Sequence, residues 1–405
     1  MMPLPSASDT GMRILGARRY AQLDTLSHLW AAQQPAWGDH PDLACIRAEL
    51  ADLPALVALP EIQALRTALA RVEDGDAHLL HVGECAETFA MADDAHVARR
   101  LSLYRRLADH LADRTGREVV LVARLAGQHA KPRSEPMEAS PDGGQIPVYR
   151  GDAVNAEEQT AHARRADPWR LLCSYDRSVD TLRFLRAQPG PGRSPFVSHE
   201  ALLRDYEEPL TRGGTQLYSS SGHLLWIGDR TRGRDDWHVQ WAASLANPVG
   251  LKLGPTVTPN EAVGLIRILN AEGEKGRLSI ITRMGAVAAV DRLTGLTRAV
   301  ADSGIPVLWQ CDPMHGNTSK SGEVKLRLLP DIRAEISAFT RILGEAGVHR
   351  GGLHMEVTPD IVAECHEDLS LALDRGPRPP CDPRLNPDQA LEIVDHFATE
   401  IARRQ

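Results

Sequence analysis

The sequence lacks the features that mark secreted and membrane-spanning proteins. Residues 1–20 contain no apolar run long enough for a signal peptide, and no stretch approaches the length of a membrane span. We therefore expect a cytoplasmic protein that contacts no membrane. The formal net charge of −8 argues against nucleic acid as a partner, because a phosphate backbone is bound by a basic surface.

Cysteine is scarce and scattered. The 6 cysteines in 405 residues form no CxxC pair, so neither a disulfide framework nor a structural zinc ribbon is expected. Free cysteine packs like a small apolar residue, so each is expected to be a buried thiol unless it takes part in chemistry. The cysteines are Cys45, Cys85, Cys173, Cys311, Cys365 and Cys381.

Helical spacing of apolar residues dominates the first part of the chain. Residues 27–39, 41–53 and 60–75 are predicted to be helical. After them the pattern changes to short apolar segments that alternate with amphipathic helices. We therefore predict a helical extension over residues 1–75 and a catalytic domain over residues 76–405.

The alternation after residue 75 is typical of a parallel α/β sheet or barrel. Eight strand–helix units fit a TIM (β/α)8 barrel with insertions. An open doubly wound sheet is the alternative, but it more often carries a glycine-rich phosphate loop after the first strand, and residues 83–86, GECA, are not GxGxxG. The predicted strands are 77–85, 118–127, 195–200, 224–230, 249–254, 278–285, 306–313 and 351–357.

A polar stretch rich in Pro and Gly covers residues 131–160. It is too long for an ordinary connection between a strand and a helix. Long loops in compact domains are often functional.

Four possible metal ligands lie at or after the ends of predicted strands. In a closed barrel the last strand neighbours the first, so Cys85, His315, Glu356 and Asp382 are expected to converge. A thiolate, an imidazole and two carboxylates are a plausible set for a divalent metal. Singly, His315 also fits a hydrogen-bonded loop histidine, and Asp382 a turn residue. Glu356 lies inside an apolar strand, where a carboxylate needs a partner.

Cations form a second group at the same strand ends. Arg124, Lys252 and Arg283 lie inside apolar segments, where an unpaired cation is costly. Internal salt bridges or an anionic ligand explain them, and three at corresponding positions favour a polyanionic ligand. The full group is Arg124, Lys131, Arg133, Arg230, Lys252 and Arg283. Together the metal-ligand group and the cations indicate a metal beside a pocket for phosphate and carboxylate, which is compatible with a metal-dependent aldolase or a phosphoesterase.

Eleven motifs, in the same order along the chain, carry a family resemblance. With them the sequence resembles the type II (plant-type) 3-deoxy-D-arabino-heptulosonate 7-phosphate (DAHP) synthases, from about residue 25 to residue 400. The motifs are QQPAWGD, GECAE, RLAGQHAKPRS, YRGDAVN, SHEALL, WIGDRTR, VGLKLGP, ITRMGA, QCDPMHGNT, GGLHMEV and CDPRLNP.

The resemblance implies a TIM barrel with N-terminal helices, and it assigns roles to single residues. It implies metal ligation by the four residues named above. It implies that phosphoenolpyruvate is bound by Arg124, Arg230, Lys252, Arg283 and Trp226. It implies that the phosphorylated aldehyde, erythrose 4-phosphate in the family, faces Lys131, Arg133 and Ser134.

The expected chemistry is an aldol-like condensation that releases phosphate, with Lys131, Asp229 and Lys252 as catalytic residues. Lys131 is expected to protonate or stabilise the developing alkoxide, and Asp229 to orient water. Mn²⁺ or Co²⁺ is the expected metal, with Fe²⁺ or Zn²⁺ also compatible. Cys85 and Cys381 are expected to lie close enough to form a disulfide when the metal is lost.

The chain departs from the family pattern at several places, none of which is a metal ligand or a cation of the phosphoenolpyruvate site. Glu84 and Asp229 replace a usual Asp and Glu, and residues 235–238, 367–368 and 378–380 also differ. The chain resembles a short form of the family, found in secondary metabolism such as phenazine biosynthesis. A homodimer or larger oligomer and a contact with chorismate mutase are expected. An aminated acceptor, or a retired paralogue that regulates a partner, are the alternatives.

Overall fold

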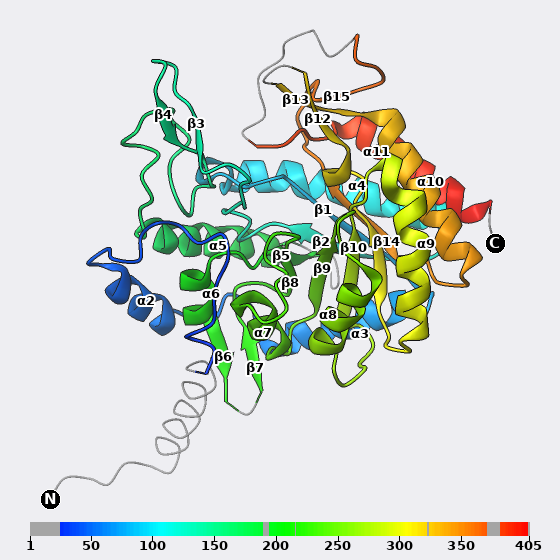
Figure 1. Cartoon of the computed structure of the whole chain (residues 1–405), viewed down its shortest axis with the longest axis horizontal. Coiled ribbons are helices and arrows are strands. Elements are labelled where there is room, and N and C mark those ends of the chain that lie inside the picture. Colours follow the sequence, from blue (N-terminus) through cyan, green and yellow to red (C-terminus); the bar gives the residue numbers. More distant parts are fainter. Residues whose placement is uncertain (1–24, 189–193, 215, 322–323, 371–380, 404–405) are drawn as a thin grey trace, which may run out of the picture.

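The computed structural model describes residues 25–188, 194–214, 216–321, 324–370 and 381–403. Eight parallel strands close into a barrel in the order β1-β14-β11-β10-β9-β8-β5-β2 (Figure 1). Each coincides with a predicted strand, and the predicted α/β barrel is confirmed. The strands are β1 (Ala77–Gly83), β2 (Glu118–Arg124), β5 (Phe196–Glu200), β8 (Leu224–Ile227), β9 (Val249–Leu253), β10 (Leu278–Thr282), β11 (Leu308–Cys311) and β14 (Gly352–Glu356).

A helix follows each barrel strand and covers its outer side (Figure 1). Local sequence fixes several of the helix ends: Asp93 accepts hydrogen bonds from the first turn of α4, and Gly116 ends that helix in the left-handed conformation, at φ 66°. The helices are α4 (Asp94–Thr115), α5 (Arg170–Arg186), α6 (Arg204–Leu210), α7 (Trp237–Ala243), α8 (Pro259–Leu269), α9 (Ala286–Asp302), α10 (Leu329–Glu345) and α11 (Pro387–Ala402).

Two helices precede the barrel, α2 (Leu43–Asp52) and α3 (Leu59–Glu73), and both were predicted. Helix α3 closes the amino-terminal end of the barrel, because its buried residues pack on side chains that line the barrel interior. The contributing α3 residues are Leu65, Leu69 and Val72. Residues 1–24 of the predicted extension lie outside the described residues, and the domain division stays a prediction.

The helix predicted over residues 27–39 is wrong. The chain there forms turns without a helix. Gln33 adopts a left-handed backbone conformation, at φ 61°, and Pro35 and Gly38 follow it. A residue at positive φ cannot continue a right-handed helix, and Pro35 has no N–H for its hydrogen-bond ladder.

Short strands decorate the loops around the barrel. The long loop 131–160 carries a hairpin of β3 (Met137–Ala139) and β4 (Gln145–Pro147). A second small sheet joins β12 (Thr318–Ser321), β13 (Val324–Leu328) and β15 (Cys365–His366), and a further hairpin joins β6 (Thr211–Gly213) and β7 (Leu217–Ser219). The β3–β4 hairpin and the β12–β13–β15 sheet rise on the side of the barrel opposite α3 (Figure 1).

The sequence predicts buried cysteines and no membrane-spanning segment. Four cysteines are buried, but Cys45 and Cys173 are exposed, because they lie on the solvent-facing sides of α2 and α5. Among the described residues, no helix has the length and apolar character needed to cross a membrane.

Candidate active site

Side chains inside the barrel change from apolar at one end to charged at the other. Next to α3 the interior is apolar, with Leu79, Val120, Leu224 and Leu308. The middle of the barrel is polar, with His81, Ser198, Trp226, Gln310 and His354. The carboxyl end of the strands is charged, with Arg124, Glu200, Lys252, Asp312 and Glu356. Because successive residues of one face lie two apart, the inward face of five strands, β2, β5, β9, β11 and β14, ends in a charged residue at the mouth.

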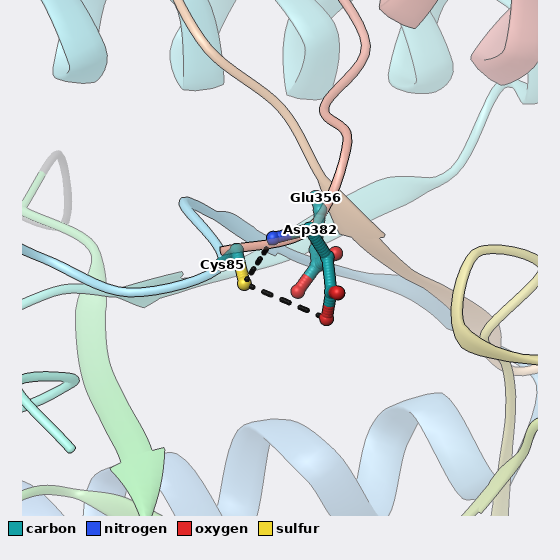
Figure 2. Close-up of side chains that lie close together, drawn as sticks. All are labelled: Cys85, Glu356 and Asp382. Carbon is teal, nitrogen blue, oxygen red and sulfur yellow. Dashed lines mark hydrogen bonds between the residues drawn. The ribbon is translucent and has the colours of Figure 1, made fainter. Parts of the chain in front are cut away.

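Three of the four predicted metal ligands form one compact group at this mouth (Figure 2). The possible ligand atoms of Cys85, Glu356 and Asp382 all lie within 4.8 Å of one another. They come from the ends of β1 and β14 and from the loop after β15, as barrel closure predicts. His315 borders the group, with its Nε2 3.0 Å from Glu356 Oε1.

The imidazole of His315 is oriented by a neighbouring carboxylate. Its Nδ1 lies 2.7 Å from Asp312 Oδ2, and Asp312 is buried and also pairs with Lys252 at 3.1 Å. With a metal bound, a proton on Nδ1 directed at Asp312 would leave the lone pair of Nε2 for the ion; here Nε2 contacts Glu356 Oε1 instead. This is the arrangement by which carboxylates commonly orient metal-binding histidines.

Glu356 is fully buried between cations. Arg327 on β13 donates to its Oε2 at 2.7 Å, and Arg124 donates to its Oε1 at 3.2 Å. Burial opposes the charged carboxylate, but the charges of His315 and Arg327 hold the pKa of Glu356 well below its usual range. The residue is therefore an anion at neutral pH and is available as a ligand.

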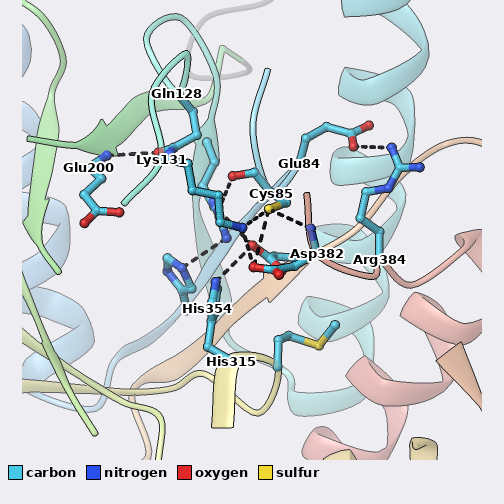
Figure 3. A network of polar contacts seen from close by, with 12 residues as sticks. Glu84, Cys85, Gln128, Lys131, Glu200, His315, His354, Asp382 and Arg384 are labelled. Atoms are coloured by element: carbon cyan, nitrogen blue, oxygen red, sulfur yellow. Dashed lines mark hydrogen bonds and ion pairs between the residues drawn. The ribbon is translucent and has the colours of Figure 1, made fainter. Parts of the chain in front are cut away.

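Two lysines contact the carboxylate of Asp382. Lys325 donates to Oδ1 at 2.7 Å, and Lys131 donates to Oδ2 and to the sulfur of Cys85 (Figure 3). Burial works against both charges, but Lys131 lowers the pKa of Asp382 well below its usual range, and Asp382 raises that of Lys131. The ammonium of Lys131 thus lies among the sulfur of Cys85 and the oxygens of Asp382, which shows that this position favours a cation. A set of sulfur, imidazole and carboxylate donors fits a divalent metal.

Cys381 adjoins the same group, as the sequence predicted. It belongs to a buried cluster with Cys85, Ala86 and Tyr149, and the Cys85 thiol is its hydrogen-bond partner. That hydrogen bond lowers the pKa of Cys381 to about 7. The disulfide between the two cysteines stays a prediction, since both thiols are free.

A cavity of about 280 Å³ opens above the metal-ligand group. Every site residue predicted from the sequence lines it except Glu356, which lies buried beneath. Its predicted cations are Arg124, Lys131, Arg133, Arg230, Lys252 and Arg283. Among the residues that the structure describes, the cavity also contains Gln128, Glu200, Lys320 and Lys325, which the sequence analysis did not single out.

The cations on one side of the cavity surround Trp226. The Arg124 guanidinium lies 5.3 Å and the Lys252 ammonium 5.5 Å from the centre of its ring. Arg283 is held by Asp229 at 3.1 Å and by the carbonyl of His315 at 3.0 Å. Each of these cations pairs with one carboxylate, Arg124 with Glu356, Lys252 with Asp312 and Arg283 with Asp229. Lysines and arginines nevertheless outnumber carboxylates in the cavity lining as a whole, which suits a small polyanion.

The family model described as "Class-II DAHP synthetase family" matches residues 21–195 and 192–398. The chain belongs to this family. A Streptomyces coelicolor protein named phospho-2-dehydro-3-deoxyheptonate aldolase is 38% identical over 92% of this chain and 95% of its own. A Pseudomonas fluorescens protein named a probable enzyme of that kind is 39% identical over 90% and 94%. The predicted family and the predicted enzyme class are confirmed.

A solved structure of a phospho-2-dehydro-3-deoxyheptonate aldolase from Francisella tularensis shares the fold. The two structures superpose with a TM-score of 0.55, and the match covers 90% of this chain and 97% of the Francisella tularensis chain. The sequence identity is 13%, so this likeness supports the barrel alone.

Asp229, predicted to orient water, is already a hydrogen-bond acceptor for three groups. Its Oδ1 accepts from the backbone N–H of Gly254 at 3.1 Å and from Arg232 at 2.9 Å, and its Oδ2 accepts from Arg283. Glu200 offers a second carboxylate in the cavity. Its Oε1 is buried and has no hydrogen-bond partner among the described residues, and burial raises its pKa despite the charge of Lys252.

Several site residues were missed although they lie inside the quoted motifs. Asp312 belongs to QCDPMHGNT and Glu200 to SHEALL, and each continues the inward face of a strand. Side chains two residues apart in a strand lie on the same face, so extending the inward face of each strand by one such step would have found both. Lys325 and Arg327 could not be found this way, because β13 lies outside the barrel and its approach depends on tertiary packing.

Among the described residues, the departures from the family pattern lie outside this cavity, except for Asp229, which lines it. Glu84 pairs with Arg384 at 2.7 Å within a buried ion cluster, and Glu367 pairs with Arg333 at 2.7 Å on the surface. Trp237 is buried and donates to Glu208 at 2.8 Å. The departure at residues 378–380 lies outside the described residues.

Proposed function

We propose that this chain condenses phosphoenolpyruvate with erythrose 4-phosphate to form DAHP and phosphate. The observation that carries the proposal is that the metal-ligand group and all of the predicted cations meet at one cavity. A phosphorylated enol acid and a phosphorylated aldehyde are both small polyanions, and both require cations and a site of carbonyl activation. Membership of the family supports the same reaction.

Phosphoenolpyruvate fits the side of the cavity next to Trp226. Its carboxylate and phosphate would pair with Arg124, Lys252, Arg283 and Arg230, and arginine supplies bidentate contacts to both groups. Arg124 and Lys252 are nearly fully buried, which strengthens their pull on an anion and fixes its orientation.

Erythrose 4-phosphate fits the opposite side. Arg230 donates to Ser134 at 2.6 Å, and Arg133 lies beside Ser134 in the cavity wall. The backbone N–H of Arg133 is anchored by the side chain of Gln33 at 2.9 Å. Arg133 and Ser134 would hold the phosphate and leave the aldehyde directed at Lys131 and the ligand group.

Cys85, His315, Glu356 and Asp382 would hold the metal, and Mn²⁺ or Co²⁺ suits this mixed donor set, with Fe²⁺ or Zn²⁺ as other candidates. When bound, such an ion supplies a Lewis acid for the aldehyde carbonyl. Lys131, whose ammonium lies at the ligand group, would give its proton to the alkoxide that forms as carbon 3 of phosphoenolpyruvate bonds to the aldehyde carbon.

The second half of the reaction takes place at carbon 2. The cations around Trp226 would stabilise the phosphate as water adds to carbon 2 and the C–O bond to phosphate breaks. The proton released by water needs an acceptor in the cavity. Asp229 is our first candidate for orienting the water, and the unpartnered Oε1 of Glu200 is the second.

The test is phosphate release from phosphoenolpyruvate by the full chain. Protein treated with EDTA should be inactive, and Mn²⁺ or Co²⁺ should restore release only when erythrose 4-phosphate is present. Release without the aldehyde would instead indicate a phosphoesterase. A metal-restored protein that is inactive with erythrose 4-phosphate but active with an aminated aldehyde phosphate would support the alternative acceptor.

The alternative of a retired regulatory paralogue has less support. The buried charges Glu356, Arg124 and Lys252 are costly to keep without a ligand. Assembly into a dimer or larger oligomer, a contact with chorismate mutase, and service in secondary metabolism rest on the family resemblance alone. Light scattering of the purified protein tests the first of these directly.

A further inference from the structure

A chain of hydrogen bonds runs through the polar middle of the barrel, beneath the cavity. Arg124 Nη1 lies 3.3 Å from His354 Nε2, and His354 Nδ1 lies 3.0 Å from His81 Nδ1. His81 Nε2 lies 2.7 Å from Ser198 Oγ, and Ser198 donates to the carbonyl of Ala123 at 3.0 Å. This series of hydrogen bonds thus begins at the side chain of Arg124 on β2 and ends at the backbone carbonyl of Ala123, the preceding residue of the same strand.

Strand register places these residues together. His81 on β1 pairs directly with His354 on β14, and both histidines and Ser198 are fully buried. Figure 3 shows His354 beside the labelled ligands of the mouth. Burying two imidazoles in a barrel interior is costly unless both rings are fully hydrogen-bonded, so their partners are specific.

Only one direction of donation satisfies the whole chain. A guanidinium is always a donor, so His354 Nε2 must accept, and the proton of His354 is on Nδ1. That proton is donated to His81 Nδ1, so the proton of His81 is on Nε2 and is donated to Ser198. Ser198 in turn donates to a backbone carbonyl. Both histidines are therefore neutral, with opposite tautomers, and each ring nitrogen of the two histidines has one partner.

The same two rings pack against Trp226. His81 and His354 meet the indole edge-on, with ring centres 5.3 and 5.4 Å away and interplanar angles of 73° and 84°. The guanidinium of Arg124 lies over the indole at 5.3 Å. The histidine pair thus touches both Arg124 and Trp226 from below, while the cavity touches them from above.

We propose that His354, His81 and Ser198 are positioning residues that set the guanidinium of Arg124 and the indole of Trp226 for phosphoenolpyruvate. This rests on the proposed function, in which Arg124 binds that substrate. Among the described residues, the other hydrogen-bond partners of the Arg124 side chain are Glu356 and the carbonyl of Cys85, which both belong to the metal-ligand group. His354 is the contact that fixes the guanidinium independently of that group.

Direct binding of phosphoenolpyruvate, measured by calorimetry on the full chain, tests the proposal. His354→Leu removes the acceptor for Arg124 at similar volume, and Ser198→Ala removes the far end of the chain. We expect His354→Leu to weaken phosphoenolpyruvate binding about 10-fold. Ser198→Ala should weaken it less, and the KM for erythrose 4-phosphate should change little in either variant.

His78→Gln is the matched control. His78 is also buried on β1, but it takes no part in these hydrogen bonds and stacks on His349 instead. This variant should leave phosphoenolpyruvate binding unchanged. Nitrogen-15 NMR of histidine-labelled wild-type protein gives a second measurement that needs no variant. It should show two neutral histidines, protonated on Nδ1 in His354 and on Nε2 in His81.

The results separate this proposal from the proposed function. Equal phosphoenolpyruvate affinity in wild type and His354→Leu, or a proton on Nε2 of His354, would overturn the positioning role even if turnover is normal. The opposite case is also distinguishable. If the wild type binds phosphoenolpyruvate but makes no DAHP, and His354→Leu binds it more weakly, the positioning role stands and the proposed function is overturned. If His354→Leu does not fold, Ser198→Ala and the NMR spectrum decide.

Discussion

At the scale of single residues, the site is defined by charges that satisfy one another. Glu356 lies between Arg124 and Arg327, and Lys131 and Lys325 share the carboxylate of Asp382. Each ligand carboxylate is thereby held charged and oriented before a metal or substrate binds. Such prior organisation is what electrostatic catalysis requires, because no reorientation is needed during the reaction.

The first prediction concerns Glu356. Glu356→Gln removes a ligand charge and leaves Arg327 without its ion pair, so metal content and DAHP formation should fall on the order of 100-fold. Metal analysis after gel filtration and the phosphate-release assay measure both. The control is Glu364→Gln, because Glu364 is a buried carboxylate paired with Arg384 away from the cavity. Full metal content in the Glu356 variant would contradict the assigned ligand set.

The second prediction concerns Cys85 and Cys381. Because their thiols are in contact, diamide should oxidise them to an intramolecular disulfide in EDTA-treated protein. Bound Mn²⁺ should protect them, since it would hold Cys85. Mass spectrometry of peptides from both samples detects the bond, and Cys381→Ser is the control. Equal oxidation with and without metal would argue that Cys85 is not a ligand.

At the scale of elements, α3 acts as the floor of the barrel, and its energetic role can be measured. Leu65→Ala opens a cavity in the apolar interior end, and we expect a loss of about 2–5 kcal/mol in the free energy of unfolding. Thr67→Ala, on the exposed side of the same helix, should change it by less than about 0.5 kcal/mol. Urea denaturation compares them, and equal stability would show that α3 is not part of the barrel core.

Helix α10 reaches the mouth through Glu335, whose oxygens accept from Met284 N–H at 2.7 Å and from Asn317 at 2.8 Å. Burial, reinforced by Asp312, raises the pKa of Glu335 to about 8 from the ordinary value of 4.5. The folded state therefore takes up a proton between these values. The stability that this contributes is fully present below pH 4.5 and is lost as the pH rises through about 8.

Glu335→Gln tests this, because the amide cannot ionise. The free energy of unfolding of the wild type should decline relative to the variant between pH 5 and pH 9, by an amount on the order of a few kcal/mol. Parallel urea titrations across that range measure the difference. A difference that stays constant with pH would mean that Glu335 titrates normally.

The elements of the barrel were predictable because hydrophobic pattern and strand ends are local. The failed helix at residues 27–39 shows the limit: its apolar spacing was helical, but Gln33 anchors Arg133 and turns to positive φ. That contact joins residues distant in sequence, so no local pattern reveals it. The histidine chain is similar, since His81 and His354 look like ordinary buried residues until strand register pairs them.

At the scale of the whole molecule, one gradient organises the barrel. Its interior passes from the apolar floor at α3, through uncharged polar and aromatic side chains, to the charged mouth. The floor supplies stability, and the middle holds the mouth residues in place. The ligand and cation sets were predictable because they lie at strand ends, whereas the supporting residues from β13 depend on loop packing.

The central claim is that the chain joins carbon 3 of phosphoenolpyruvate to an aldehyde carbon. Carbon-13 NMR with phosphoenolpyruvate labelled at carbon 3, erythrose 4-phosphate and Mn²⁺ tests it most directly. We predict that the label appears as a ring methylene of DAHP, with one phosphate released per aldehyde consumed. Label recovered as the methyl group of pyruvate would show phosphate-ester hydrolysis instead and would contradict the account.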